Sequence, residues 1–212
     1  VQYSLNDATP AGHPATNPNT VTSYTVLDSN VTLAPATRTG YDFEGWYDNA
    51  ALSGSPITGF RTSDAANKHY YAKWSAAKSY TVNWHLNDST PAGHPATNPN
   101  TVASYTVTDA NVTIQPATRT GYRFLGWYDN PSFTGTPVTT LRTMDAANKN
   151  YYAKWDATPI SYPINYVLND GTPAGHAATN PVANLTSYTV LTNGSGNITL
   201  LPALRNGYTF LG

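Results

Sequence analysis

The sequence predicts a mainly β fold, arranged as a tandem array of small repeats, and two observations lead to this prediction. The chain copies itself at a fixed spacing, because Trp46 and Trp127 lie 81 positions apart, as do Tyr71 and Tyr152. Self-similarity at a fixed period is the signature of a repeat architecture. Within each copy, apolar and polar residues alternate with a period of two, which is the pattern of half-buried strands.

The spacing divides the chain into repeats at residues 1–78 and 79–158 and a truncated third repeat at 159–212. A unit of about 80 residues buries only roughly 60% of its unfolded surface, so its core must be dense in large side chains. The 16 Tyr and 5 Trp residues fit this requirement. Because the chain starts and stops inside the repeat, we expect it to be a piece of a longer protein.

The first element of each repeat is expected to be a strand. In residues 1–5, 82–86 and 164–168 the first, third and fifth positions stay apolar or aromatic, while the intervening positions vary. A segment rich in Pro, Gly, Asn and Thr follows at 6–20, and we expect a loop or extended chain there because proline fixes φ and removes a donor.

Short strands follow this loop. Tyr24 and Val26, then Val31 and Leu33, are expected to face inward. The corresponding side chains of the second repeat are Tyr105, Val107, Val112 and Ile114.

The segment GYDFEGWY at 40–47 predicts another strand, in which Tyr41 and Phe43 face inward. Glu44 is expected to be solvated, since the second copy has Leu125 there. Gly45 predicts a β-bulge or a close backbone approach.

The end of the repeat is expected to hold one short helical turn and a final strand. The turn lies within residues 63–68, with Ser63 as its cap. In the strand HYYAKW at 69–74, Tyr70, Ala72 and Trp74 are expected to face inward, and Tyr71 and Lys73 outward.

The composition argues against several function classes. Charged residues make up 11% of the chain, against a usual value of about 25%, and the net charge is −1. Without a basic run, the chain lacks the electrostatic footprint of a nucleic-acid-binding protein or of a protein that docks on anionic membranes. No segment approaches the roughly 20 apolar residues of a membrane span. The absence of Cys excludes disulfides and thiolate metal sites.

A metal site is also not expected. His13, His94 and His176 recur once per repeat, whereas zinc needs three or four ligands close together, so a polar role in the loop is the better interpretation. A calcium site built around Asp7 and Asp48 is the weaker alternative to a role of these side chains in turns.

Catalysis is not expected either, and neither is a cofactor. Glu44 is the sole Glu of the chain and is replaced by Leu125 in the second copy, so no acid pair recurs. There is no G-x-S-x-G motif for a serine nucleophile.

Aromatic side chains are the set that could contact a ligand, because sugars and protein partners pack on Tyr and Trp rings. The stronger expectation is that aromatic cross-strand pairs hold the small sheets together. The candidates for ligand contact are Trp46, Tyr47, Tyr71, Trp127, Tyr128 and Tyr152.

The succession LND–TP, SYTV, VTL-P-TRTGY-F-GWYDN and YYAKW resembles the Listeria–Bacteroides repeat, a group related to internalin-type B repeats. The chain departs from the common Asn-Gly-Gly of that family, since it has Asn6-Asp7 and Asn87-Asp88. The resemblance covers essentially the whole chain. It implies small β-rich modules similar to a β-grasp, strung in tandem in large bacterial surface proteins and adhesins. It supplies no catalytic residues.

Two functions are therefore expected from the sequence. The first is a non-enzymatic stalk or adhesive segment of a secreted or wall-anchored bacterial surface protein, which spaces or presents a distal binding domain. The alternative is a carbohydrate- or protein-binding module that acts through exposed aromatic residues, with avidity across the repeats. The expected partners are adjacent repeats of the same chain and host or environmental glycans or proteins, without nucleic acid and without direct membrane insertion.

Overall fold

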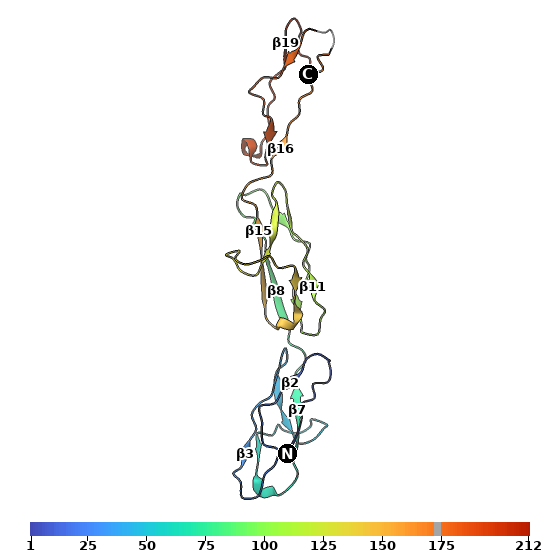
Figure 1. Ribbon diagram of the computed structural model, residues 1–212, viewed down its shortest axis with the longest axis vertical. Coiled ribbons are helices and arrows are strands. Elements are labelled where there is room, and N and C mark those ends of the chain that lie inside the picture. The colour runs from blue at the N-terminus through green and yellow to red at the C-terminus, as the bar shows by residue number, and fades with distance from the viewer. Residues whose placement is uncertain (172–174) are drawn as a thin grey trace. The chain divides into compact units, whose positions relative to one another are not determined.

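The first repeat is built around a three-stranded mixed sheet in the order β1-β7-β5 (Figure 1). The structure, a computed structural model, describes residues 1–171 and 175–212, so the third copy of the Pro-rich loop lies partly outside the described residues. Strand β1 pairs parallel to β7, and β5 pairs antiparallel to β7. The elements of this repeat are β1 (Gln2–Ser4), β2 (Ala15–Thr16), β3 (Val31–Thr32), β4 (Thr37–Arg38), β5 (Phe43–Tyr47), β6 (Gly59–Phe60), the 3-10 helix η1 (Thr62–Asp64) and β7 (His69–Trp74).

The second repeat has the same elements and one further strand in its sheet, which runs in the order β10-β8-β15-β13. In both repeats two short antiparallel ladders flank the sheet, β2 with β4 and β3 with β6 in the first. The elements of the second repeat are β8 (Tyr80–His85), β9 (Ala96–Thr97), β10 (Ser104–Tyr105), β11 (Val112–Thr113), β12 (Thr118–Arg119), β13 (Phe124–Tyr128), β14 (Thr140–Leu141), η2 (Thr143–Asp145) and β15 (Lys149–Trp155).

The third repeat contains two short ladders, β16 with β18 and β17 with β19. Its elements are β16 (Tyr162–Pro163), β17 (Ala178–Thr179), β18 (Ser187–Tyr188), η3 (Thr192–Ser195) and β19 (Leu204–Arg205). The predicted mainly β repeat array is thus confirmed. Within the described part of the chain, no helix has the length and apolar character needed to cross a membrane.

The described residues form two compact units whose limits differ from the repeat boundaries. One consists of Val1–Asn83, Thr101–Ile114 and Thr139–Asn150, and the other of Trp84–Asn100, Gln115–Val138 and Tyr151–Gly212. The boundaries at residues 78 and 158 describe the duplication of the sequence and stay a prediction.

The core of the first repeat lies on the inner face of β7. Tyr70 and Ala72 are 3% and 0% exposed, which confirms the predicted alternation in this strand. Trp46 and Phe60 pack in the same cluster. Burial in this cluster raises the pKa of Tyr70 to about 12, since the phenolate would lose its hydration there.

A bulge in β5 determines which side chains enter this core. The pairing of β5 with β7 shifts between Phe43 and Gly45, as Gly45 predicted. Gly45 has φ of 134°, and a Cβ there would lie 2.6 Å from the Cβ of Pro56, so both the conformation and the space require glycine. Beyond the bulge, Trp46 and Tyr47 are both buried.

Two local predictions were wrong. The helical turn forms, but it begins at Thr62 after Arg61, and no side chain caps it. Val26 is 57% exposed, whereas its counterpart Val107 is 2% exposed. The burial of this position therefore does not come from its own repeat.

A buried arginine holds the Pro-rich loop in the first two repeats. The Nε of Arg38 donates to the carbonyl of His13 at 2.9 Å, and Nη2 donates to three further loop carbonyls. The guanidinium carbon lies 4.2 Å from the ring centroid of Tyr41. Arg119 repeats the arrangement, with 4.3 Å to Tyr122. The half-buried Arg205 donates to the carbonyls of His176 and Asp170 and lies 4.3 Å from Tyr208. We call this arrangement the arginine clamp.

Replacing Tyr41 by phenylalanine is expected to stabilise the first repeat. The Tyr41 hydroxyl is buried and has no hydrogen-bond partner among the described residues. Removing an unsatisfied buried polar group should raise the free energy of unfolding by about 1 kcal/mol. The matched control is Tyr24→Phe, because the Tyr24 hydroxyl donates to the carbonyl of Ala66. Chemical denaturation should show opposite signs for the two variants, and an equal loss in both would contradict the prediction.

The third repeat leaves exposed the apolar side chains that the second repeat buries. Tyr188 is 41% exposed against 4% for its counterpart Tyr105, and Tyr208 is 47% exposed against 7% for Tyr122. Residues 159–212 contain no counterpart of Trp127 or of strand β15, and residues 210–212 correspond only to the start of β13.

Limited proteolysis is therefore expected to trim the chain toward residue 160, while the first two repeats persist. Exposed apolar chain that lacks its covering strands opens at low free-energy cost, and proteolysis follows such openings. Mass spectrometry of the digest over time measures the effect. Equal persistence of peptides from all three repeats would contradict it.

Candidate ligand-contact surface

The outward face of the sheet carries a stacked pair of rings in the first repeat. The rings of His69 and Tyr71, both on β7, have centroids 4.2 Å apart and planes at 22°. Nδ1 of His69 lies 3.1 Å from the Tyr71 hydroxyl, and Nε2 lies 2.8 Å from the Ser4 hydroxyl on the neighbouring strand β1. All three side chains are half-buried, so the pair remains partly open to solvent.

The second repeat builds the same ring pair from different strands. Tyr152 takes the position of Tyr71, and its partner is His85, with centroids 4.4 Å apart and planes at 9°. His85 lies on β8, at the position that Ser4 occupies in the first repeat, whereas Asn150 replaces His69. An imidazole thus stacks on the same tyrosine in both repeats although the sequence positions that supply it differ. We call these two ring pairs the histidine–tyrosine pairs.

The other predicted ligand-contact aromatics lie in the core, and the expectation that they are exposed is corrected. Trp46 and Trp127 are 1% and 2% exposed. Their indole N–H groups donate to the carbonyls of Ala34 and Gln115 at 2.9 and 2.8 Å. The bulge at Gly45 turns Trp46 inward, and the register shift in β13 does the same for Trp127.

Tyr47 and Tyr128 are also buried, with exposed fractions of 5% and 7%. The ammonium of Lys73 lies 5.4 Å from the centroid of the Tyr47 ring, and that of Lys154 lies 5.1 Å from the Tyr128 ring. The lysines therefore cover these rings through cation–π contacts. Of the predicted candidates, Tyr71 and Tyr152 keep partly accessible rings.

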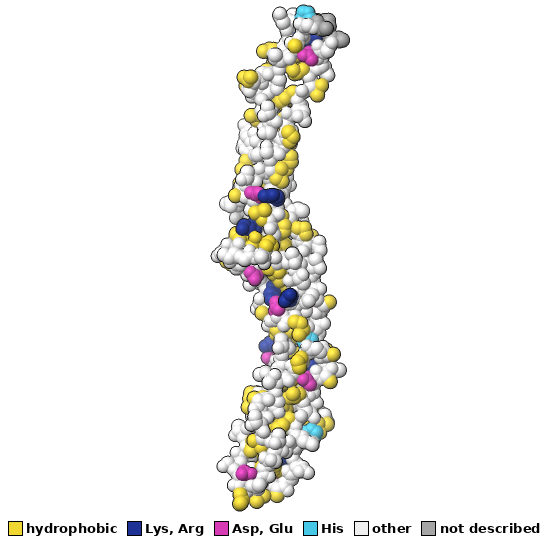
Figure 2. Space-filling model, in the orientation of Figure 1, with side chains coloured by type: hydrophobic (Ala, Val, Ile, Leu, Met, Phe, Trp, Pro, Cys, Tyr) yellow, Lys and Arg dark blue, Asp and Glu magenta, His cyan; other side chains and the backbone are white. Residues whose placement is uncertain are grey.

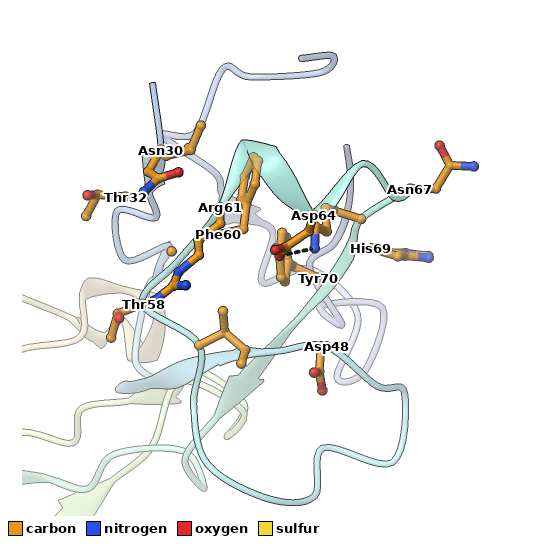
Figure 3. Close-up of a pocket in the computed structure, with 14 residues that line it drawn as sticks. Asn30, Thr32, Asp48, Thr58, Phe60, Arg61, Asp64, Asn67, His69 and Tyr70 are labelled. Atoms are coloured by element: carbon orange, nitrogen blue, oxygen red, sulfur yellow. Dashed lines mark hydrogen bonds and ion pairs between the residues drawn. The ribbon is translucent and has the colours of Figure 1, made fainter. Parts of the chain in front are cut away.

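A shallow open pocket of about 720 Å³ lies next to His69, between the β3–β6 ladder and the start of β7. Its charged side chains include Asp48, Arg61, Asp64 and Lys68, of which Lys68 and Asp64 form an ion pair at 3.0 Å. Figure 3 shows Asp64 beside Tyr70, with His69 and Asn67 pointing away from them. The pocket thus carries charges of both signs.

Charged side chains are few in the chain as a whole, at 11% of residues. Figure 2 shows Lys and Arg scattered among Asp and Glu on the displayed face. Within residues 1–171 and 175–212, no three His, Cys, Asp or Glu side chains come together as metal ligands. Asp7 instead accepts the amide N–H of Ala15 at 2.6 Å, and Asp88 accepts that of Ala96 in the same way. These two carboxylates thus bind the backbone of the Pro-rich loop, while Asp48 accepts the side-chain amide of Asn49 at 3.0 Å.

Sequence comparison agrees with the internal duplication. The profile of the Listeria-Bacteroides repeat domain matches residues 1–73 and 80–154. A protein of Evansella cellulosilytica named "Putative membrane protein" is 29% identical over 179 residues, which is 84% of this chain and 24% of that protein. The chain thus spans about a quarter of the length of this relative. No solved structure gives a significant match. The family match covers most of the chain and both complete repeats, and the chain belongs to the Listeria–Bacteroides repeat family.

Proposed function

We propose that this chain is a non-enzymatic repeat segment of a bacterial cell-surface protein that spaces or presents a distal binding domain. The main support is the set of structural features that the two complete repeats share. They keep the arginine clamp, the bulge and the buried tryptophan, all of which serve folding. Outward positions such as Glu44 and Leu125 differ between copies.

The location on the cell surface rests on the family and on the name of the relative. Members of the family resemble modules of bacterial surface proteins, and the matched protein of Evansella cellulosilytica carries a membrane-protein name. A polar, Cys-free chain is suited to an extracellular setting because it has no thiols that must be kept reduced.

A reach assay tests the spacer role. A reporter binding domain is fused after Gly212 and anchored to a brush-coated surface through the chain, or through the chain with residues 1–81 added before Val1. We expect the longer array to capture more surface-bound ligand, while the affinity for soluble ligand stays the same. Capture that does not depend on the number of repeats would overturn the proposal.

A second candidate function is glycan or protein binding through the histidine–tyrosine pairs. It is favoured by the recurrence of an imidazole stacked on Tyr71 and on Tyr152 despite the change in its sequence position. A partly exposed aromatic pair offers a flat surface for a sugar ring or a protein side chain. Two weak sites on one chain would gain affinity by avidity.

Glycan arrays and titration against matrix proteins test this candidate. Tyr71→Ala and Tyr152→Ala should each weaken binding, and the double variant should abolish it, with circular dichroism unchanged. Tyr71→Phe, which keeps the ring, should retain most of the binding. Binding that survives the double alanine variant would eliminate the histidine–tyrosine pairs as the site.

A further inference from the structure

A valine of each following repeat packs on a turn glycine of the repeat before it. A Cβ placed on Gly40 would overlap the side chain of Val107, and a Cβ on Gly121 would overlap that of Val190. Gly40 and Gly121 have φ of 80° and 75°. Each is the middle residue of a Thr-Gly-Tyr sequence, and we call this segment the TG-Y turn. The same pairing of valine and glycine therefore occurs twice.

The polypeptide that joins the repeats is fixed to the same turn. The amide of Lys78 donates to the carbonyl of Gly40 at 2.8 Å, and the amide of Ile160 donates to that of Gly121 at 2.8 Å. The carbonyl of the turn glycine thus accepts a hydrogen bond from the junction. The valine side chain packs against its Cα, where any other residue would carry a side chain. We call this pair of contacts the glycine joint.

The valine lies on a turn that is closed by hydrogen bonds within its own repeat. In the second repeat the amide of Thr106 donates to Asp109 Oδ2 at 2.6 Å. In the first repeat the amide of Thr25 donates to Asp28 Oδ2 at the same distance. Both turns also close through a backbone bond of 3.2 Å from the Asp amide to the Thr carbonyl. The turn of the first repeat is therefore preorganised.

In the first repeat, the apolar side chains of this turn are exposed to solvent. Val26 is 57% exposed and Leu27 is 92% exposed, whereas Val107 in the joint is 2% exposed. We propose that Val26 and Leu27 form a docking surface for the TG-Y turn of another repeat of this type, joined ahead of Val1 with the spacing of the first two repeats. The contact is head-to-tail, so one repeat offers the turn glycine and the next offers the valine. This inference does not rest on the spacer role, since a binding array would need the same joint.

Thiol labelling tests the docking surface, because the chain has no Cys of its own. Val26→Cys introduces a single thiol, whose alkylation rate is measured in the chain and in the chain with residues 1–81 added before Val1. We expect the added repeat to slow labelling at least tenfold, toward the rate of Val107→Cys in the original chain. An unchanged rate would overturn the proposal. Ser63→Cys, at an exposed position of η1, is the control whose rate should not change.

A second measurement keeps the test independent of the added repeat. Hydrogen exchange is followed at the amide of Tyr41, which donates to the carbonyl of Arg38 next to Gly40. Val107→Ala should speed this exchange several-fold, although residue 107 belongs to the following repeat. Val26→Ala, the same substitution at the equivalent position, should leave the exchange unchanged. Equal effects of the two variants would show that the valine serves only its own repeat and would overturn the joint.

Discussion

Replacing Trp46 by alanine is expected to unfold the first repeat and to leave the core of the second repeat intact. The Trp46 side chain is 1% exposed and makes edge-to-face contacts with Tyr3 and Phe43, at centroid distances of 5.5 and 5.4 Å. Its removal should cost about 3–5 kcal/mol, the usual range for a buried Trp→Ala change. A domain of this size has a total stability of about 4–12 kcal/mol, so the loss removes much of it.

Hydrogen exchange with peptide-level mass spectrometry separates the repeats in this test. Peptides from β5 and β7 should lose protection, whereas those from β13 and β15 should keep it. Trp127→Ala should reverse the pattern, because Trp127 holds the same place in the second repeat and is 2% exposed. Trp46→Phe is the matched control, since it keeps an apolar ring and should cost less than half as much. A folded Trp46→Ala repeat with normal protection would contradict the burial of this side chain.

Period-two alternation predicted strands β5 and β7 well, because each has one face on the core. Tyr70 and Ala72 are buried, and Phe43 packs against the same cluster. The alternation failed at Trp46 for a definable reason. Counting by twos from Phe43 places Trp46 outward, but the bulge at Gly45 inserts a residue and returns the indole to the core. Gly45 predicts the bulge, but simple alternation does not include the reversal of facing that a bulge imposes on the residues after it.

Two other features depend on contacts that a residue-by-residue pattern does not contain. Val107 is buried partly by Gly40, which belongs to another repeat, so the pattern of one repeat could not place it. The histidine–tyrosine pairs could not be predicted from the sequence pattern either. His69 and His85 occupy different positions in their repeats and become equivalent only when the strands pair. Pairing of β1 with β7 places Ser4 opposite Tyr71, which is what brings the two positions to one ring.

The arginine clamp has a signal in the sequence, but the sequence does not show the partners of the arginine. Arginine recurs at the same place in all three copies, as Arg38, Arg119 and Arg205. An aspartate recurs with it, as Asp7, Asp88 and Asp170, and sequence alone would suggest an ion pair. In the structure the Asp7 carboxylate accepts the amide of Ala15. Arg38 donates to the backbone carbonyl of Asp7. Its partners are backbone carbonyls of a loop, which any residue supplies.

Replacing Arg38 by alanine is expected to release the Pro-rich loop and to destabilise the first repeat by about 3 kcal/mol or more, because hydrogen bonds to a charged group contribute about 1.5–3 kcal/mol each. Arg38 is 6% exposed, and its loss leaves the carbonyls of His13, Thr9 and Pro10 without their donor. Chemical denaturation gives the loss of stability, and exchange of the Ala15 amide reports the opening of the loop.

Two matched variants show what the guanidinium contributes. Arg38→Lys keeps the charge but not the planar fork that reaches several carbonyls at once, so it should recover only a small part of the loss. Arg61→Ala removes the same charge from an exposed position and should change stability by no more than about 0.5 kcal/mol. Because the acceptors of Arg38 are uncharged, the loss should be the same at low and high salt, which screens only interactions between charges. A loss that fades with added salt, or one that Arg38→Lys fully rescues, would mean that charge and not the geometry of the fork holds the loop.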